Sequence, residues 1–89
     1  MARVTFSPEG FRSLTQLPTP VRLRFNESIA ILEASGPDAS LLDTHPLSGT
    51  GILWTLRIGT YRGIFRWKID EARIIRFGHR ARVYLRLPT

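Results

Sequence analysis

The most constraining feature of this sequence is a pair of strand-like segments joined by the dipeptide Gly59-Thr60. Apolar and polar residues alternate on both sides of it, which is typical of a β-hairpin with one buried face. Glycine at the first position of a two-residue loop indicates a type II′ turn. That turn would place Arg57 directly opposite Arg62. It would also pair Ile58 with Tyr61, so we expect a hairpin with one register.

The two faces of this hairpin differ in character. The face expected to form core holds Trp54, Leu56, Ile58, Tyr61, Phe65, Trp67 and Ile69. The other face holds Leu53, Thr55, Arg57, Arg62, Ile64, Arg66 and Lys68. Like charges directly opposite each other destabilise a hairpin, so the facing arginines indicate an anionic ligand. Long arginines that splay into water and only keep the face soluble are an equally good interpretation.

The N-terminal part predicts a short strand over residues 3–6 and then two helices. Ser7-Pro8 is a cap followed by a first-turn proline, and Thr19-Pro20 is expected to start the second helix in the same way. Ser35-Gly36-Pro37 ends that helix. The apolar stripes of the two helices are Phe11, Leu14 and Leu17, then Val21, Phe25, Ile29 and Leu32. We expect this helical hairpin to cover the apolar face of the strands.

Residues 38–51 are rich in Ser, Gly, Thr and Pro and predict a loop. Leu41, Leu42 and Leu47 are its expected anchors. His45 lies in this loop, and a surface histidine is favoured over a metal ligand because no second ligand type clusters around it.

The connection before the last strand decides which face each later residue takes. A two-residue loop would place Arg76 in the core, which is costly for an unpaired charge. A connection of three residues, 70–72, is therefore preferred. It sends Ile75 and Phe77 inward and puts Ile74, Arg76, Gly78 and Arg80 on the basic face.

The expected fold class is α+β: a short N-terminal strand, a helical hairpin, and a three-strand antiparallel meander that forms one twisted sheet covered on one face by the helices. With 89 residues the chain is expected to be a single domain, residues 1–89. It contains no cysteine and no apolar run near the length of a membrane span. We therefore expect a cytoplasmic protein with no membrane partner.

Positive charge is concentrated in the C-terminal third. The net charge is +6, and residues 57–89 carry nine basic residues against two acidic ones. Twelve of the thirteen basic residues are arginine, whose guanidinium binds phosphate in a bidentate way. This distribution predicts a polyanionic partner.

Four segments in order are Pro46-Leu47-Ser48-Gly49, residues 54–62 (WTLRIGTYR), Gly78-His79-Arg80 and Val83-Tyr84. This set resembles the RelE/ParE superfamily of bacterial and archaeal toxins, over essentially the whole chain. The resemblance implies the toxin half of a type II toxin–antitoxin pair. The RelE branch, which is favoured, cuts messenger RNA in the ribosomal A site and stops translation. The ParE branch instead inhibits DNA gyrase.

The resemblance also implies roles for individual residues. Arg57, Arg62 and Arg80 would hold the scissile phosphate, and Tyr84 would lie near the attacking 2′-hydroxyl, with His79 beside them. The further basic residues expected to bind RNA are Arg66, Lys68, Arg76 and Arg82. The implied partners are a small acidic antitoxin, the ribosome with its mRNA, and operator DNA bound through the antitoxin complex. No metal or cofactor is expected, since the sequence has neither a carboxylate–histidine cluster nor a Gly-rich phosphate loop.

Cleavage of RNA through its own 2′-hydroxyl requires removal of a proton, stabilisation of charge on phosphorus, and protonation of the departing 5′-oxygen. Arginine supplies the second function, and Tyr84 or His79 is the expected base. A structural histidine and a core-capping tyrosine are the alternatives. Leu53 and Thr55 stand where the best-known RelE toxins have lysines, so a ParE-like gyrase inhibitor and an inactive homologue that only binds antitoxin and promoter DNA stay open.

Overall fold

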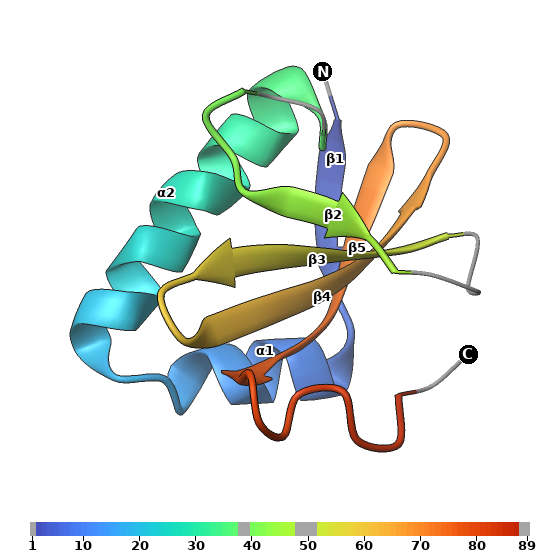
Figure 1. Cartoon of the computed structure of the whole chain (residues 1–89). Helices are drawn as coiled ribbons and strands as arrows, with labels where there is room; N and C mark the ends of the chain where they lie inside the picture. Colours follow the sequence, from blue (N-terminus) through green and yellow to red (C-terminus); the bar gives the residue numbers. More distant parts are fainter. Residues whose placement is uncertain (1, 38–39, 48–51, 88–89) are drawn as a thin grey trace.

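The computed structural model describes residues 2–37, 40–47 and 52–87. Its elements are β1 (Arg3–Phe6), α1 (Pro8–Thr15), α2 (Thr19–Ser35), β2 (Thr44–Pro46), β3 (Leu53–Ile58), β4 (Tyr61–Lys68) and β5 (Glu71–His79) (Figure 1). The strands form one sheet in the order β1-β5-β4-β3-β2. β1 runs parallel to β5, and the other neighbours are antiparallel. The predicted α+β fold is confirmed, with a mixed sheet.

The strand β2 was not predicted, because residues 38–51 were expected to form a loop. It consists of three residues and pairs along the free side of β3. It ends in Pro46, which cannot donate a backbone hydrogen bond and is tolerated at a sheet edge. A strand this short shows no alternation that a sequence pattern could reveal.

The β3–β4 hairpin has the predicted register. Ile58 pairs with Tyr61, and Arg57 lies directly opposite Arg62. Gly59 has a φ of 58° and fills the first loop position. This is the conformation that a type II′ turn requires and that glycine adopts without cost.

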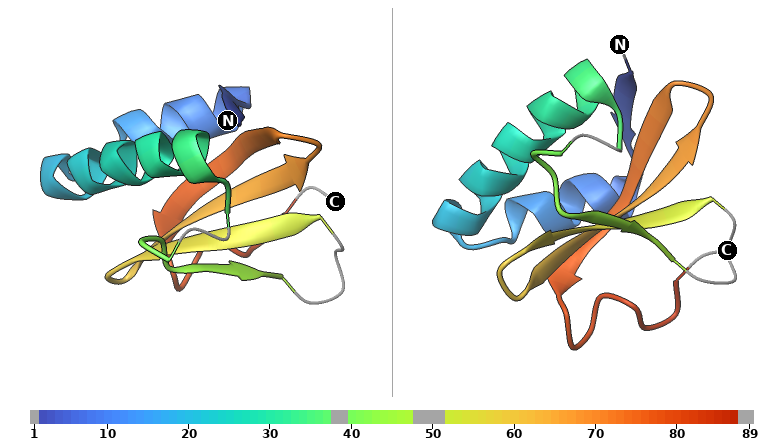
Figure 2. Two further views of the ribbon diagram at one scale, coloured as in Figure 1. Left: turned by 90° about the horizontal axis from the view of Figure 1, so that it is seen from above. Right: turned by 45° about the horizontal axis from the view of Figure 1, so that its top comes forward.

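Both helices lie on one face of the sheet, as Figure 2 shows. The main core between helices and sheet is formed by Leu17, Phe25, Leu32, Leu56, Ile58, Phe65, Ala72, Ile74 and Phe77. The rings of Phe25 and Phe77 meet edge to face, with their centroids 4.8 Å apart, and this contact links α2 to β5. Phe11 was expected in the core but is 61% exposed, since α1 packs mainly through residues on its other side.

The predicted start is confirmed for the first helix and is wrong for the second. Ser7 caps α1 as predicted, and its Oγ accepts a hydrogen bond from the Gly10 amide at 2.9 Å. The second helix begins one residue earlier than expected, at Thr19, with Pro18 at the cap position and no side-chain cap. Thr19 therefore does not cap α2.

The predicted three-residue connection before β5 is wrong. Lys68 pairs with Glu71, and the loop is the dipeptide Ile69-Asp70, with φ values of 38° and 59°. Two positive φ values define a type I′ turn, which suits the twist of a hairpin. Ile69, expected in the core, is 87% exposed at the tip of this turn.

A β-bulge reconciles this short loop with an outward Arg76. The register of β4 and β5 shifts between Ile64 and Phe65, so that Phe65 faces Ile74 while Ile64 faces Arg76. Ile74 therefore enters the main core and Ile75 does not, which is the reverse of the prediction. Phe77 packs inward as predicted. The extra residue at a bulge reverses the face of the strand residues on one side of it. A pattern that alternates every two residues does not predict this reversal.

The face of the sheet away from the helices, called the outer face below, is not wholly basic. Leu53, Ile64, Ile75 and Val83 form a second buried cluster there. Val83 belongs to the turn segment 80–86, called the C-terminal segment below. This segment follows β5 and is red in Figure 1. This segment is thereby packed onto the outer face, next to the arginines.

Candidate functional site

Arg57 and Arg62 form the centre of the candidate site on the outer face. Both Nη1 contacts of Arg62 go to its own turn, with the carbonyl oxygens of Gly59 and Tyr61 each accepting at 2.9 Å. Arg57 is 39% exposed, and its Nε lies 3.4 Å from Oδ1 of Asp43. Arg57 and Arg62 lie directly opposite each other in the register of the hairpin, so an anion bound by both guanidinium groups would offset the repulsion between the two charges.

Tyr84 is brought to this pair by Thr55. The hydroxyl of Tyr84 lies 3.3 Å from Oγ1 of Thr55. Thr55 and Arg57 are two residues apart on β3, so their side chains share the outer face. Tyr84 is 41% exposed and can meet a ligand there. The structure thus places a phenol on the same face as the two arginines, in contact with the residue two positions before Arg57 on β3.

Arg80 and Arg82 lie in the exposed segment after β5. The backbone amide of Arg80 donates to the carbonyl of Thr60 at 2.8 Å, which fastens this segment to the β3–β4 turn. The amide of Arg82 donates to the carbonyl of His79 at 2.9 Å. The backbone of both residues therefore lies close to the β3–β4 hairpin, which carries Arg62.

His79 lies on the other face. It pairs with Tyr61, and the two rings meet at 5.6 Å on the side covered by the helices. Its Nδ1 accepts a hydrogen bond from the amide of Ala81 at 3.1 Å, which holds the turn after β5. The structure does not bring His79 together with Arg57 and Arg62.

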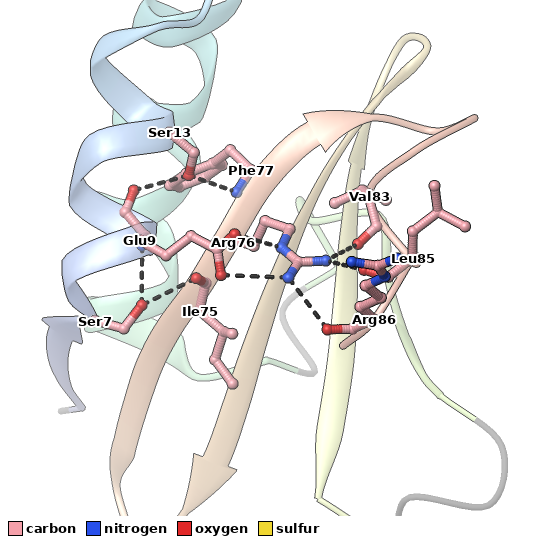
Figure 3. A network of polar contacts seen from close by, with 10 residues as sticks. Ser7, Glu9, Ser13, Ile75, Arg76, Phe77, Val83, Leu85 and Arg86 are labelled. Atoms are coloured by element: carbon pink, nitrogen blue, oxygen red, sulfur yellow. Dashed lines mark hydrogen bonds and ion pairs between the residues drawn. The ribbon is translucent and has the colours of Figure 1, made fainter. Parts of the chain in front are cut away.

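Arg76 has most of its donors directed at protein groups, and its side chain is only 15% exposed. Figure 3 shows its guanidinium between Glu9 at the start of α1 and the carbonyl groups of the C-terminal segment. Its Nε donates to Oε2 of Glu9 at 3.0 Å, and its Nη1 donates to the carbonyls of Val83 and Leu85 at 3.0 and 2.6 Å. These contacts hold the segment that carries Tyr84.

The outer face contains a second pair of facing arginines toward the far end of the sheet. Arg66 on β4 lies directly opposite Arg73 on β5. Arg73 also donates to Oγ1 of Thr5 on β1 at 3.4 Å. Lys68 is exposed and pairs with Glu71 in register. Sequence reasoning singled out Arg66 and Lys68 but missed Arg73, whose face depends on the two-residue turn.

Asp43 and His45 were also missed as members of the site. β2 places His45 directly opposite Thr55, so its side chain shares the outer face with Thr55 and Arg57. Its Nε2 lies 2.9 Å from Oδ1 of Asp43 and contacts Nη2 of Arg57. The only signal in the sequence was the Asp-x-His spacing, which places both side chains on one face only if a strand forms.

The sequence matches no protein-family model and no curated protein, whereas the fold matches solved structures over most of its length. It is similar to a chain of the RelB–RelE antitoxin–toxin complex from Methanococcus jannaschii, with a TM-score of 0.80, 24% identity, and coverage of 94% of this chain and 99% of that one. The match to the archaeal RelE–RelB complex from Pyrococcus horikoshii OT3 has a TM-score of 0.73 and 31% identity, covering 92% of this chain and 98% of that one. The chain belongs to the RelE-like toxin family. The isolated E. coli RelE toxin shares the fold at a TM-score of 0.72 and 17% identity, covering 89% and 84%.

Two positions at which this RelE-like chain lacks expected lysines have defined structural roles. Leu53 is 3% exposed and lies in the buried cluster of the outer face. Thr55 is 5% exposed and holds the hydroxyl of Tyr84. The basic side chains on the outer face of this RelE-like chain come from other positions of β3, from β4 and β5, and from the C-terminal segment.

Two further properties concern the described ranges 2–37, 40–47 and 52–87. No helix in them has the length and apolar character needed to cross a membrane. They also bring together no group of three or more His, Cys, Asp or Glu side chains that could hold a metal ion.

Proposed function

We propose that this RelE-like protein is the toxin of a toxin–antitoxin pair and acts as a ribosome-dependent endoribonuclease. It cuts messenger RNA through the RNA's own 2′-hydroxyl and so blocks translation. The observation that carries this proposal is the convergence of Arg57, Arg62 and Tyr84 on one exposed face. A phosphodiester bound there would receive two guanidinium groups and a hydroxyl.

The chemistry suits this arrangement. During cleavage, negative charge grows on the oxygens around phosphorus, and preorganised cations stabilise it most in the transition state. Arg57 and Arg62 supply that charge at the centre, and Arg80 adds to it from the adjoining segment. Tyr84 exchanges a proton with one of the reacting RNA oxygens. The more distant Arg66, Lys68 and Arg82 bind the flanking RNA backbone.

The comparisons support an antitoxin as one of the proposed partners. The similar archaeal structures are complexes of RelE with RelB. We expect this chain to bind a small acidic antitoxin that covers its basic surface, and the resulting complex to bind operator DNA. A protein that acts on translating ribosomes works in the cytoplasm.

Expression of the chain in bacteria without antitoxin tests this function. Messenger 5′ ends and plasmid supercoiling are measured in the same cells. We expect codon-phased cuts that disappear in Arg62→Ala and persist in Arg12→Ala, a matched control whose arginine is exposed on α1. Intact messages with relaxed plasmid would instead assign a ParE-like inhibition of gyrase. Intact messages with normal supercoiling would leave antitoxin and promoter binding as its function.

A further inference from the structure

Cleavage through the 2′-hydroxyl needs two proton transfers, and the residues given roles in the proposed function include only one suitable group, Tyr84. The 2′-hydroxyl must lose a proton, and the departing 5′-oxygen must gain one. Tyr84 can serve one of these oxygens. Arginine keeps its protons at neutral pH and cannot act as the base. His79 lies on the helix-covered face and holds the turn after β5.

His45 is the imidazole that the fold does bring to the outer face. It lies directly opposite Thr55, and Thr55 in turn contacts the hydroxyl of Tyr84. Its side chain is 50% exposed, so that RNA can reach the ring. β2 thus places His45 opposite Thr55, the residue that contacts Tyr84, and next to Arg57.

The contacts of Nε2 suit a group that gains and loses a proton. This nitrogen faces a donor, Nη2 of Arg57, and an acceptor, Oδ1 of Asp43 at 2.9 Å. A neutral ring with its lone pair on Nε2 accepts from Arg57. A ring protonated on Nε2 donates to Asp43. Each protonation state therefore has a partner already in place.

We propose that His45 is the general base of the cleavage reaction, an assignment that rests on the proposed ribonuclease function. Nε2 of His45 takes the proton of the 2′-hydroxyl, and the 2′-oxygen forms a bond to phosphorus. The bond from phosphorus to the 5′-oxygen breaks, and the 5′-oxygen leaves with its electron pair and takes a proton from the hydroxyl of Tyr84. The products are a 2′,3′-cyclic phosphate and a 5′-hydroxyl, and water returns the proton from His45 to Tyr84.

The assignment of roles follows from the starting protonation states. A neutral imidazole has a free lone pair, whereas a phenol carries a proton at neutral pH. The charged and titratable groups that face His45 among the described residues are Asp43, just before β2, and Arg57 on β3, with Tyr84 beyond Thr55. Arg57 turns to the phosphate when RNA is bound.

The test is single-turnover cleavage of mRNA on programmed ribosomes, measured between about pH 5.5 and 9 with the full chain. We expect the wild-type rate to rise with pH and then level off. His45→Gln should lower the rate at pH 7 by about 100-fold or more and remove the rising limb, while ribosome binding stays within about threefold. Glu33→Gln, exposed on α2, is the control for a changed polar side chain.

A second variant keeps the test valid if His45→Gln folds poorly. His45→Ala leaves space for a free ring, and added imidazole should restore cleavage in a dose-dependent way. If the wild type cuts and both variants cut at its rate with its pH profile, His45 is not the base, and the ribonuclease function stands. If the wild type leaves ribosome-bound mRNA intact, the proposed function fails and this inference falls with it.

Discussion

Replacement of Arg76 by methionine is expected to destabilise the fold and release the C-terminal segment. Methionine keeps most of the aliphatic volume, so the change isolates the guanidinium and its partners. It removes the ion pair with Glu9 and the hydrogen bonds to the carbonyls of Val83 and Leu85. Together with a longer hydrogen bond to the carbonyl of Arg86, at 3.4 Å, these hydrogen bonds join Arg76 to the segment bearing Tyr84.

The size of the expected fall in the free energy of unfolding can be estimated from the contacts that Arg76 loses. The side chain of Glu9 is 44% exposed, so the ion pair itself contributes only about 1 kcal/mol. The two carbonyl hydrogen bonds to a charged donor add about 1 kcal/mol each after water replaces them. We therefore expect the free energy of unfolding to fall by roughly 2–3 kcal/mol. For a domain of this size this lowers the melting temperature by roughly 10–20 °C.

Equilibrium urea unfolding measures the loss, and amide hydrogen exchange locates it. The amides of Val83 and Leu85, which donate to the carbonyls of His79 and Arg82, should exchange faster in Arg76→Met than the amides of β4. The matched control Arg12→Met replaces an exposed arginine of α1 and should stay within about 0.5 kcal/mol of the wild type. A free energy of unfolding for Arg76→Met equally close to the wild type would refute the reasoning.

Three other substitutions test individual contacts of the structure. Gly10→Ala places a Cβ 2.4 Å from the carbonyl oxygen of Ile74 and should cost more than about 2 kcal/mol in thermal unfolding. Gly59→Ala meets no atom within 4 Å and should cost only about 1 kcal/mol, because only its positive φ is strained; an equal loss in both glycine variants would contradict the contact geometry. Thr55→Val should leave the free energy of unfolding within about 1 kcal/mol, yet lower single-turnover cleavage at least about tenfold, because Tyr84 loses the partner that positions it. Unchanged cleavage by Thr55→Val would show that this contact does not position Tyr84.

The sequence predicted the elements whose signals are local. The glycine of a type II′ turn set the register of β3 and β4, and with it the facing pair Arg57 and Arg62. A serine followed by proline marked the start of α1. These features depend on a few adjacent residues, and their conformational preferences are strong enough that packing did not override them.

The errors came from features that depend on distant partners. The type I′ turn at Ile69-Asp70 puts a β-branched residue, Ile69, at a positive φ that such residues rarely adopt, so the local sequence did not indicate it. The bulge opposite Ile64 then restored the outward direction of Arg76 that the three-residue loop had been introduced to explain. Two compensating irregularities thus gave the correct face for Arg76 and the wrong one for Ile74.

The same dependence on distant partners governs the candidate site. Arg57, Arg62 and Tyr84 were predicted, and their convergence rests on one hairpin and on the contact of Tyr84 with Thr55. His79 was placed beside the arginines by the resemblance alone. It lies two residues after the inward Phe77, so strict alternation already puts it on the helix-covered face.

The unpredicted strand β2 changes the chemistry available on the outer face more than any other difference. Without β2, the basic sheet offers cations and a phenol, which bind and polarise a phosphodiester but contain no group that accepts a proton at neutral pH. With β2, a half-exposed imidazole stands beside Arg57, with a carboxylate at hydrogen-bonding distance. A strand of three residues at a sheet edge adds little stability, since it buries little apolar surface. Its contribution to this protein is therefore better explained by the side chains that it positions than by the fold that it completes.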